Sequence, residues 1–277
     1  MQFVSSQSGD RALVLDSPHS GTVYPVDFAY ACPLDELRRA EDTHVEKLYA
    51  FAPALGVHWV EAHFPRSYLD ANRNTTEIDP QLLDAPWPGL LEGGSKVRLG
   101  KGLVWRLTDD GTPIYQRALG VAEVAQRIAT CWEPYHAAVA QAIDAAHARH
   151  GYCIHINCHS MPAVSGSHAT EFPGLVHADF VVGDRDGSTA SPVLSRHVCR
   201  YLAERGYTVE YNHPYKGVEL VRRHGQPAAH RHSLQLEVNR RLYMDETTLE
   251  LHDGFAALQD TLRTLVQLLL ATDPRLL

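Results

Sequence analysis

Short strand-like runs alternate with helical stretches along most of this chain of 277 residues. Buried apolar or alternating runs that predict strands occupy residues 12–21, 57–64, 153–159, 178–184, 207–212 and 233–239. Apolar residues at helical spacing occupy residues 34–55, 118–150, 191–206 and 246–271. Strands that alternate with helices form a mixed, largely parallel sheet with helices on both faces. The sequence therefore predicts an α/β fold, with residues 1–277 as a single domain.

Three segments leave the boundaries of these elements open. Residues 34–55 fit either one helix or two, with a new start near Asp42, and Gly56 supplies a stop. The Ala-rich stretch 118–150 is interrupted at Pro134. Residues 74–114 are rich in Pro, Gly and Asp, which predicts a long loop excursion from the domain without assigning its structure.

Charge and composition exclude several classes of protein. The net charge is -8 and the chain has no run of Lys or Arg, so we expect no nucleic-acid partner. No apolar run approaches the length of a membrane span, and the N-terminus lacks the pattern of a secretory signal, so we expect a cytoplasmic protein. The five cysteines contain no CxxC pair, which favours reduced core thiols over disulfides.

Polar residues stand at three predicted strand ends, namely His19, His159 and Glu237. In open α/β sheets, ligands bind at the carboxyl ends of the strands. Two imidazoles and a carboxylate at neighbouring strand ends suit a catalytic divalent metal with a nearby base. Either histidine alone would more often be structural, but Glu237 on an otherwise apolar strand favours the metal site.

The strand at 153–159 carries two further polar residues on the same face as His159. His155 lies roughly 6 to 7 Å deeper along the strand and is expected to belong to the core. Asn157 lies between them and is placed to orient a neighbour.

Six ordered segments resemble the N-formylglutamate amidohydrolase family, which is related to the zinc carboxypeptidases and aspartoacylases. They are SPHSG, EDTHVEKLY, RSYLDANR, HINCHSMP, NHPYKG and SLQLEVNRRLYMDE, and they span residues 17–246. The resemblance implies a phosphorylase/hydrolase-like, zinc-exopeptidase-like fold. It further implies a metal held by His19 and His159, with Glu237 as the general base.

The third metal ligand is where this chain departs from the carboxypeptidase-like pattern. That pattern has a glutamate three residues after the first histidine, where this chain has Thr22. Asp42 is the preferred substitute, and His44 either contacts a ligand without binding the metal or is the alternative ligand. In an unbroken helix these two side chains would point about 200° apart, so Asp42 can serve only if the helix starts anew there.

Substrate recognition has its own candidates in the same resemblance. Asn72 and Arg73 match a pair that binds the substrate carboxylate in the related enzymes, and Arg66 matches an arginine that polarises the scissile carbonyl. Guanidinium groups suit both tasks, although Arg66 and Asp70 also fit a structural ion pair. Lys216 is a further cation for an acidic substrate, with Arg222 and Arg223 as competitors.

These expectations combine into a metal-dependent amidohydrolase that converts N-formyl-L-glutamate and water into formate and L-glutamate. It would use one divalent ion, with Zn the first expectation and Co, Fe or Mn also compatible. In this hypothesis Glu237 accepts the proton of a metal-activated water, and Arg66 stabilises the oxyanion. An aspartoacylase- or carboxypeptidase-like hydrolase of another N-acyl amino acid is one alternative. A non-catalytic domain that binds metal or an amino acid is the other.

Overall fold

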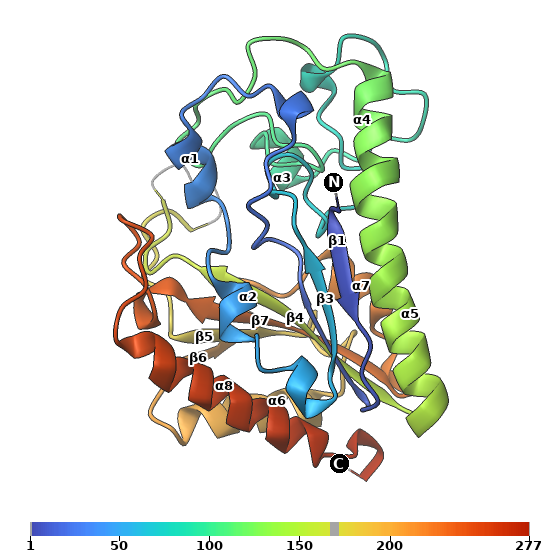
Figure 1. Cartoon of the computed structure of the whole chain (residues 1–277), viewed down its shortest axis with the longest axis vertical. Coiled ribbons are helices and arrows are strands. Elements are labelled where there is room, and N and C mark those ends of the chain that lie inside the picture. The colour runs from blue at the N-terminus through green and yellow to red at the C-terminus, as the bar shows by residue number, and fades with distance from the viewer. Residues whose placement is uncertain (1, 167–171, 277) are drawn as a thin grey trace.

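A computed structural model describes residues 2–166 and 172–276 of the chain, and a seven-stranded sheet forms its centre (Figure 1). The strands are β1 (Val4–Gln7), β2 (Leu13–Ser17), β3 (His58–Ala62), β4 (Cys153–Met161), β5 (Phe180–Gly183), β6 (Val209–Tyr211) and β7 (Arg231–Asn239). Their order across the sheet is β1-β3-β2-β4-β7-β5-β6. All six predicted strands are present, and the predicted set lacked only β1.

The four central strands β3, β2, β4 and β7 run parallel to one another. β1 joins β3 antiparallel, β5 joins β7 antiparallel, and β6 joins β5 parallel. The sheet is therefore mixed and largely parallel, as predicted. One consequence is that the carboxyl ends of β2, β4 and β7 meet at the same edge.

Helices cover both faces of the sheet, which confirms the predicted α/β architecture. They are α1 (Leu34–Arg39), α2 (Val45–Leu48), α3 (Ser95–Arg98), α4 (Val121–Arg127), α5 (Glu133–His150), α6 (Pro192–Ala203), α7 (Glu219–His224) and α8 (Gly254–Leu270). The apolar face of the sheet, with Ile156 and Leu236, packs against α2, α6 and α8 in one core. α5 lies across the opposite face, where a second core forms (Figure 1).

The face of the sheet toward α5 is polar along its centre. Asp16 of β2, His155 and Asn157 of β4, and Gln235 and Glu237 of β7 are all buried there. Alternation of side chains explains the difference between the two faces, since the intervening residues are apolar and enter the other core. A buried polar face of this kind must satisfy its hydrogen bonds internally.

The boundaries of three predicted helices are resolved by local features. Residues 40–44 break the segment 34–55, so Asp42 lies outside both α1 and α2, as the prediction of a new start required. A π-helical turn (Ile128–Trp132) precedes Pro134 and joins α4 to α5 without a loop. The predicted start of the last helix at residue 246 was wrong, because Asp245 accepts the backbone N–H groups of Thr247 and Thr248 in a turn and α8 begins only at Gly254.

The excursion at 74–114 is folded rather than open. It contains the short helix α3 and places Leu103 and Trp105 in the second core. Its backbone also joins the polar region, since the N–H of Asp70 donates to the carbonyl of Leu103 at 2.7 Å. Across the described part of the chain, every helix is too short or too polar to cross a membrane.

Candidate metal centre

Three buried side chains, those of His19, Asp42 and His159, converge at the shared carboxyl edge of the sheet. One ligand atom from each lies within 4.8 Å of the others. Oδ2 of Asp42 is 3.4 Å from Nδ1 of His19 and 2.9 Å from Nδ1 of His159. Both imidazoles therefore present the same nitrogen to the same carboxylate oxygen.

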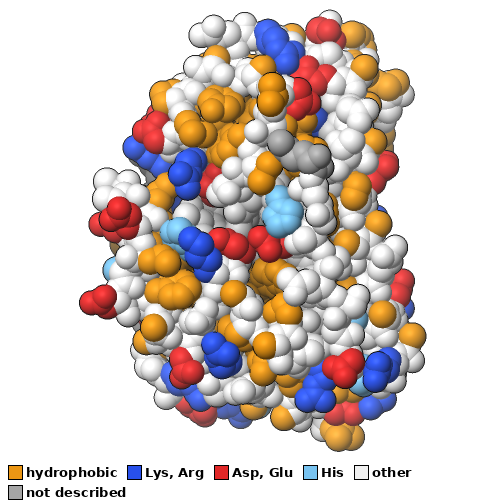
Figure 2. Space-filling model, in the orientation of Figure 1, with side chains coloured by type: hydrophobic (Ala, Val, Ile, Leu, Met, Phe, Trp, Pro, Cys, Tyr) orange, Lys and Arg blue, Asp and Glu red, His pale blue; other side chains and the backbone are white. Residues whose placement is uncertain are grey.

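The backbone explains why residues so distant in sequence meet here. His19 follows β2 directly, and His159 lies near the end of the neighbouring strand β4. The N–H of Asp42 donates to the carbonyl of His19 at 3.0 Å, which fixes the break between α1 and α2 against the strand end. Figure 2 shows acidic and histidine side chains close together near the middle of one face of the molecule.

The second nitrogen of each imidazole is held by an acceptor. Nε2 of His19 lies 2.7 Å from Oδ1 of Asp70, and Nε2 of His159 lies 2.6 Å from Oδ1 of Asn157. Because these oxygens only accept, each Nε2 carries the hydrogen, and the Nδ1 of a neutral imidazole keeps its lone pair. Protein metal sites orient their histidine ligands in this way.

The donor set fits a divalent cation. Nδ1 of His19 is buried without a hydrogen-bond partner, and a cation placed between the two Nδ1 atoms and the Asp42 carboxylate would bind all three. Two imidazoles and one carboxylate are also ligands that catalytic divalent sites use. His19, Asp42 and His159 are thus a candidate metal triad.

Two guanidinium groups flank Asp42. Arg66 lies 3.4 Å and Arg240 lies 3.3 Å from its Oδ1. Burial alone would raise the pKa of Asp42, but the contacts with His159 and His19 and the charge of Arg66 hold that pKa well below its usual value. The carboxylate is therefore ionised and available as a ligand.

Arg66 also pairs with Asp70 at 3.1 Å, so the ion pair considered from the sequence exists. The same guanidinium lies over the ring of Trp105 at 5.1 Å and is only 18% exposed. Arg66 is thus fixed beside the metal triad by three neighbours, an arrangement that suits a preorganised cation.

Glu237 lies beside the triad because the register of β4 and β7 pairs it with His159. Burial raises the pKa of Glu237 and the charge of Asp42 raises it further, while His159 and Arg66 oppose the rise; the result is a raised pKa. Nε2 of Gln235 donates to Oε1 of Glu237 at 2.8 Å. A carboxylate with a raised pKa suits a general base.

Asn72 is brought to the site, but its amide is already engaged. Its Oδ1 accepts the N–H of Leu220 at 2.9 Å, so its Nδ2 must face the other way. That Nδ2 lies 3.3 Å from Oδ1 of Asn157 and 3.4 Å from Oε1 of Gln235. In this structure the amide of Asn72 contacts other site residues, and its role in binding substrate stays a prediction.

The structure does not bring three other predicted residues to the triad. Arg73 is buried against backbone carbonyls, with Nη1 3.0 Å from the carbonyl of Asn72. His44 has a left-handed backbone conformation and turns its Nε2 to the carbonyl of Leu249 at 2.9 Å. Lys216 is more than half exposed and pairs with Asp186 at 2.8 Å.

Three residues of the site had no role predicted from the sequence. They are Asp16, Gln235 and Arg240. Asp16 binds Nδ2 of Asn157 at 2.9 Å, and Gln235 precedes Glu237 by two residues on the same strand face. The alternation of side chains along the strand could therefore have identified Gln235. Arg240 follows β7, and the sequence contained no signal for its role.

Comparison with known proteins identifies the family to which the chain is similar. The family model described as N-formylglutamate amidohydrolase matches residues 11–244. N-formylglutamate deformylase of Pseudomonas aeruginosa is 31% identical over 255 residues, which cover 88% of this chain and 86% of that protein. The crystal structure of N-formylglutamate amidohydrolase from Ralstonia eutropha is 45% identical, with a TM-score of 0.92 and 98% of both chains covered.

A gene product of Agrobacterium tumefaciens shares the fold at 16% identity, with a TM-score of 0.69 over 98% of this chain and 94% of the other. The resemblance seen in the sequence is confirmed by the match of the family model over most of the chain. The chain belongs to the N-formylglutamate amidohydrolase family.

Proposed function

We propose that this protein hydrolyses N-formyl-L-glutamate to formate and L-glutamate with the help of one divalent metal ion. The observation that carries the proposal is the cluster of His19, Asp42 and His159 with the buried carboxylate of Glu237 beside it. Relatives named for this reaction support the choice of substrate. Zinc is the ion we propose, since two imidazoles and a carboxylate suit it well.

A divalent ion held by the triad would supply a Lewis acid for water activation and carbonyl polarisation. Gln235 holds Oε1 of Glu237, which leaves Oε2 to accept the proton of the attacking water. The oxygen of that water adds to the formyl carbon, and Arg66 stabilises the negative charge that develops on the carbonyl oxygen. Oε2 then returns the proton to the amide nitrogen as the C–N bond breaks, which gives formate and a free amine.

The charge around the triad also suits the proposed substrate, which carries two carboxylates. Arg66 and Arg240 both lie beside Asp42, on the border of the site. Two fixed guanidinium groups can attract and orient a dianionic molecule. In this proposal Arg66 lies at the scissile carbonyl, and Arg240 binds a carboxylate of the substrate.

The decisive test is Glu237→Gln, which removes the base but keeps its size. We expect at least a 100-fold loss of turnover of N-formyl-L-glutamate, because removal of a general base typically costs about that much or more. Metal content, measured by elemental analysis, should stay near that of the unchanged protein. Glu210→Gln, an exposed carboxylate in β6, is the matched control and should keep full activity.

Turnover of Glu237→Gln above about 10% of the unchanged rate would exclude the proposed role of Glu237. A panel of N-formyl and N-acetyl derivatives of Glu and Asp tests the substrate. Release from another member without release from N-formyl-L-glutamate would favour the aspartoacylase-like alternative. Bound metal without release from any member would favour a binding protein.

A further inference from the structure

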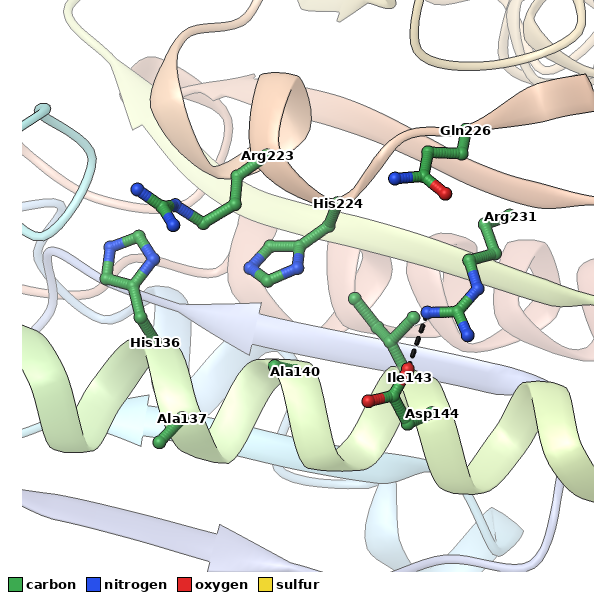
Figure 3. Close-up of a pocket in the computed structure, with 9 residues that line it drawn as sticks. All are labelled: His136, Ala137, Ala140, Ile143, Asp144, Arg223, His224, Gln226 and Arg231. Atoms are coloured by element: carbon green, nitrogen blue, oxygen red, sulfur yellow. Dashed lines mark hydrogen bonds and ion pairs between the residues drawn. The ribbon is translucent and has the colours of Figure 1, made fainter. Parts of the chain in front are cut away.

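A cavity of about 390 Å³ lies between α5 and the stretch that runs from the end of α7 to the start of β7 (Figure 3). Figure 3 shows α5 along its floor, with Arg223, His224, Gln226 and Arg231 reaching in from the other side. None of these residues takes part in the proposed reaction. The volume falls within the range of about 300 to 1,000 Å³ typical of small-molecule sites.

Two imidazoles in this cavity have a buried nitrogen without a partner. Nε2 of His136 lies 2.8 Å from the carbonyl of Ala71, so Nε2 carries the hydrogen and Nδ1 is an acceptor. His136 is 5% exposed, and its Nδ1 has no hydrogen-bond partner. Nε2 of His224 is likewise buried and unpartnered, and the two rings lie 6.2 Å apart.

Neither imidazole carries a positive charge at neutral pH. Burial lowers the pKa of His136 to about 4 and that of His224 to about 3. Nδ1 of His136 is therefore a hydrogen-bond acceptor that lacks a donor. A buried acceptor without a donor costs free energy, and a bound donor would remove that cost.

Two arginines and one carboxylate, that of Asp144, line the same cavity, which leaves the lining one net positive charge. Arg223 binds Glu219 through Nε and Nη2, and its Nη1 has no hydrogen-bond partner among the described residues. Arg231 pairs with Asp144 at 2.5 Å at the other end (Figure 3). The guanidinium groups disfavour a metal cation here and favour an anionic group.

We propose that this cavity binds a small carboxylate that also carries a hydroxyl or amino group. The hydroxyl or amino hydrogen donates to Nδ1 of His136, and the carboxylate binds the guanidinium group of Arg223 at the same end of the cavity (Figure 3). A carboxylate without such a donor leaves His136 unsatisfied and binds more weakly. The ligand class thus follows from the two kinds of group that the cavity offers.

The walls of this cavity also hold the segment that supplies two residues to the metal centre. His136 donates to the carbonyl of Ala71, which lies between Asp70 and Asn72. Trp132, over which Arg223 lies at 4.9 Å, donates to the carbonyl of Arg73 at 2.9 Å. A ligand bound in this cavity should therefore alter turnover at the metal centre. This effect on turnover rests on the proposed function, whereas binding of the ligand does not.

The test is a titration with glycolate, a hydroxy-carboxylate, followed through the isoleucine methyl groups. The chain has six isoleucines, and Ile143 lines the cavity. In the metal-free protein we expect the Ile143 methyl signal to shift with a Kd of about 1 mM, and acetate to bind at least fivefold more weakly. Chelation of the metal removes competing carboxylate binding at the triad.

Ala140→Phe places a ring in the cavity and should abolish the glycolate-induced shift. Ala145→Phe adds the same ring on an exposed part of α5 outside the cavity wall and should leave the shift unchanged. A titration of the unchanged protein in which the Ile143 signal stays fixed up to about 50 mM glycolate would overturn the proposal, as would equal binding of acetate. The Glu237→Gln protein should bind glycolate normally, so failure of the proposed reaction would leave this result unaffected.

Discussion

At the scale of single residues, the metal centre depends on amide groups that can face only one way. Nδ2 of Asn157 donates to ionised Asp16, so its Oδ1 must face Nε2 of His159. A reversed amide would place two donors together and an oxygen against a carboxylate. Asp16 therefore fixes the hydrogen on His159 from a distance, although it touches neither the metal triad nor the substrate.

The amide of Gln235 is likewise fixed in orientation, and Gln235 acts as a positioning residue whose effect can be measured. Its donation to Oε1 stabilises the ionised form of Glu237 and lowers the pKa that burial raises. Gln235→Met should reduce kcat about tenfold, the rate equivalent of one lost hydrogen bond to a charged group, and change KM little. Because the pKa of Glu237 rises further, the acidic limb of the pH–rate profile should move up by about one unit.

Gln267→Met removes an exposed amide on α8 and serves as the control. A fall in kcat with an unmoved acidic limb would mean that Gln235 acts only through packing. Metal content should remain unchanged in both variants.

His232 offers a test of buried histidines outside the metal centre. Its Nδ1 accepts the N–H of Ser191 at 3.1 Å, and burial lowers its pKa to about 4. Between about pH 4 and pH 6.5 the unfolded chain binds a proton here that the folded chain does not. The free energy of unfolding should therefore fall as pH decreases through this window.

His232→Asn keeps an acceptor near the position of Nδ1 but does not titrate. Relative to this variant, the unchanged protein should lose about 1 to 3 kcal/mol of stability between pH 6.5 and pH 4. Urea unfolding at several pH values measures the difference. A difference that stays constant with pH would show that His232 is not held neutral.

At the scale of elements, the turn after β2 depends on close backbone contact with the end of β3. A Cβ added at Gly21 would collide with the backbone of His63 and Phe64. Gly21→Ala should destabilise the fold by about 1 to 3 kcal/mol and weaken metal binding, since the turn carries His19. Gly93→Ala is the control, because nothing lies within 4 Å of a Cβ there.

Thermal unfolding and metal titration of these two variants give the comparison. Normal metal affinity in Gly21→Ala would show that the turn can shift without moving His19.

The elements also show what the sequence could and could not predict. His19, His159 and Glu237 were found because strand ends and strand alternation are visible in the sequence. The position of Asp42 depended on a break in the helical pattern, which the sequence allowed without requiring. Arg240 and the folded excursion at 74–114 were not predictable, since their positions depend on contacts with distant parts of the chain.

At the scale of the whole molecule, the proposed metal would join three separate parts of the chain. His19, Asp42 and His159 come from the turn after β2, from the break between α1 and α2, and from β4. Zinc at about 1,000 times its Kd should stabilise the folded chain by about 4 kcal/mol and raise Tm by about 10 °C. A chelator should reverse the rise, as measured by calorimetry.

Two substitutions separate the candidate third ligands. Asp42→Asn should remove most of the zinc-dependent rise in Tm. His44→Asn should keep it, because His44 faces Leu249 and asparagine tolerates the left-handed conformation at this position. The reverse pattern would make His44 the ligand.

The edge strands of the sheet affect how readily the protein aggregates at high concentration. The long strands β4 and β7, with nine residues each, are central, while the outermost strands β1 and β6 have only four and three. Short outer strands offer few free backbone groups to another molecule, which limits edge-to-edge aggregation. The two nine-residue strands at the centre are thus kept away from intermolecular pairing by short strands on both edges of the sheet.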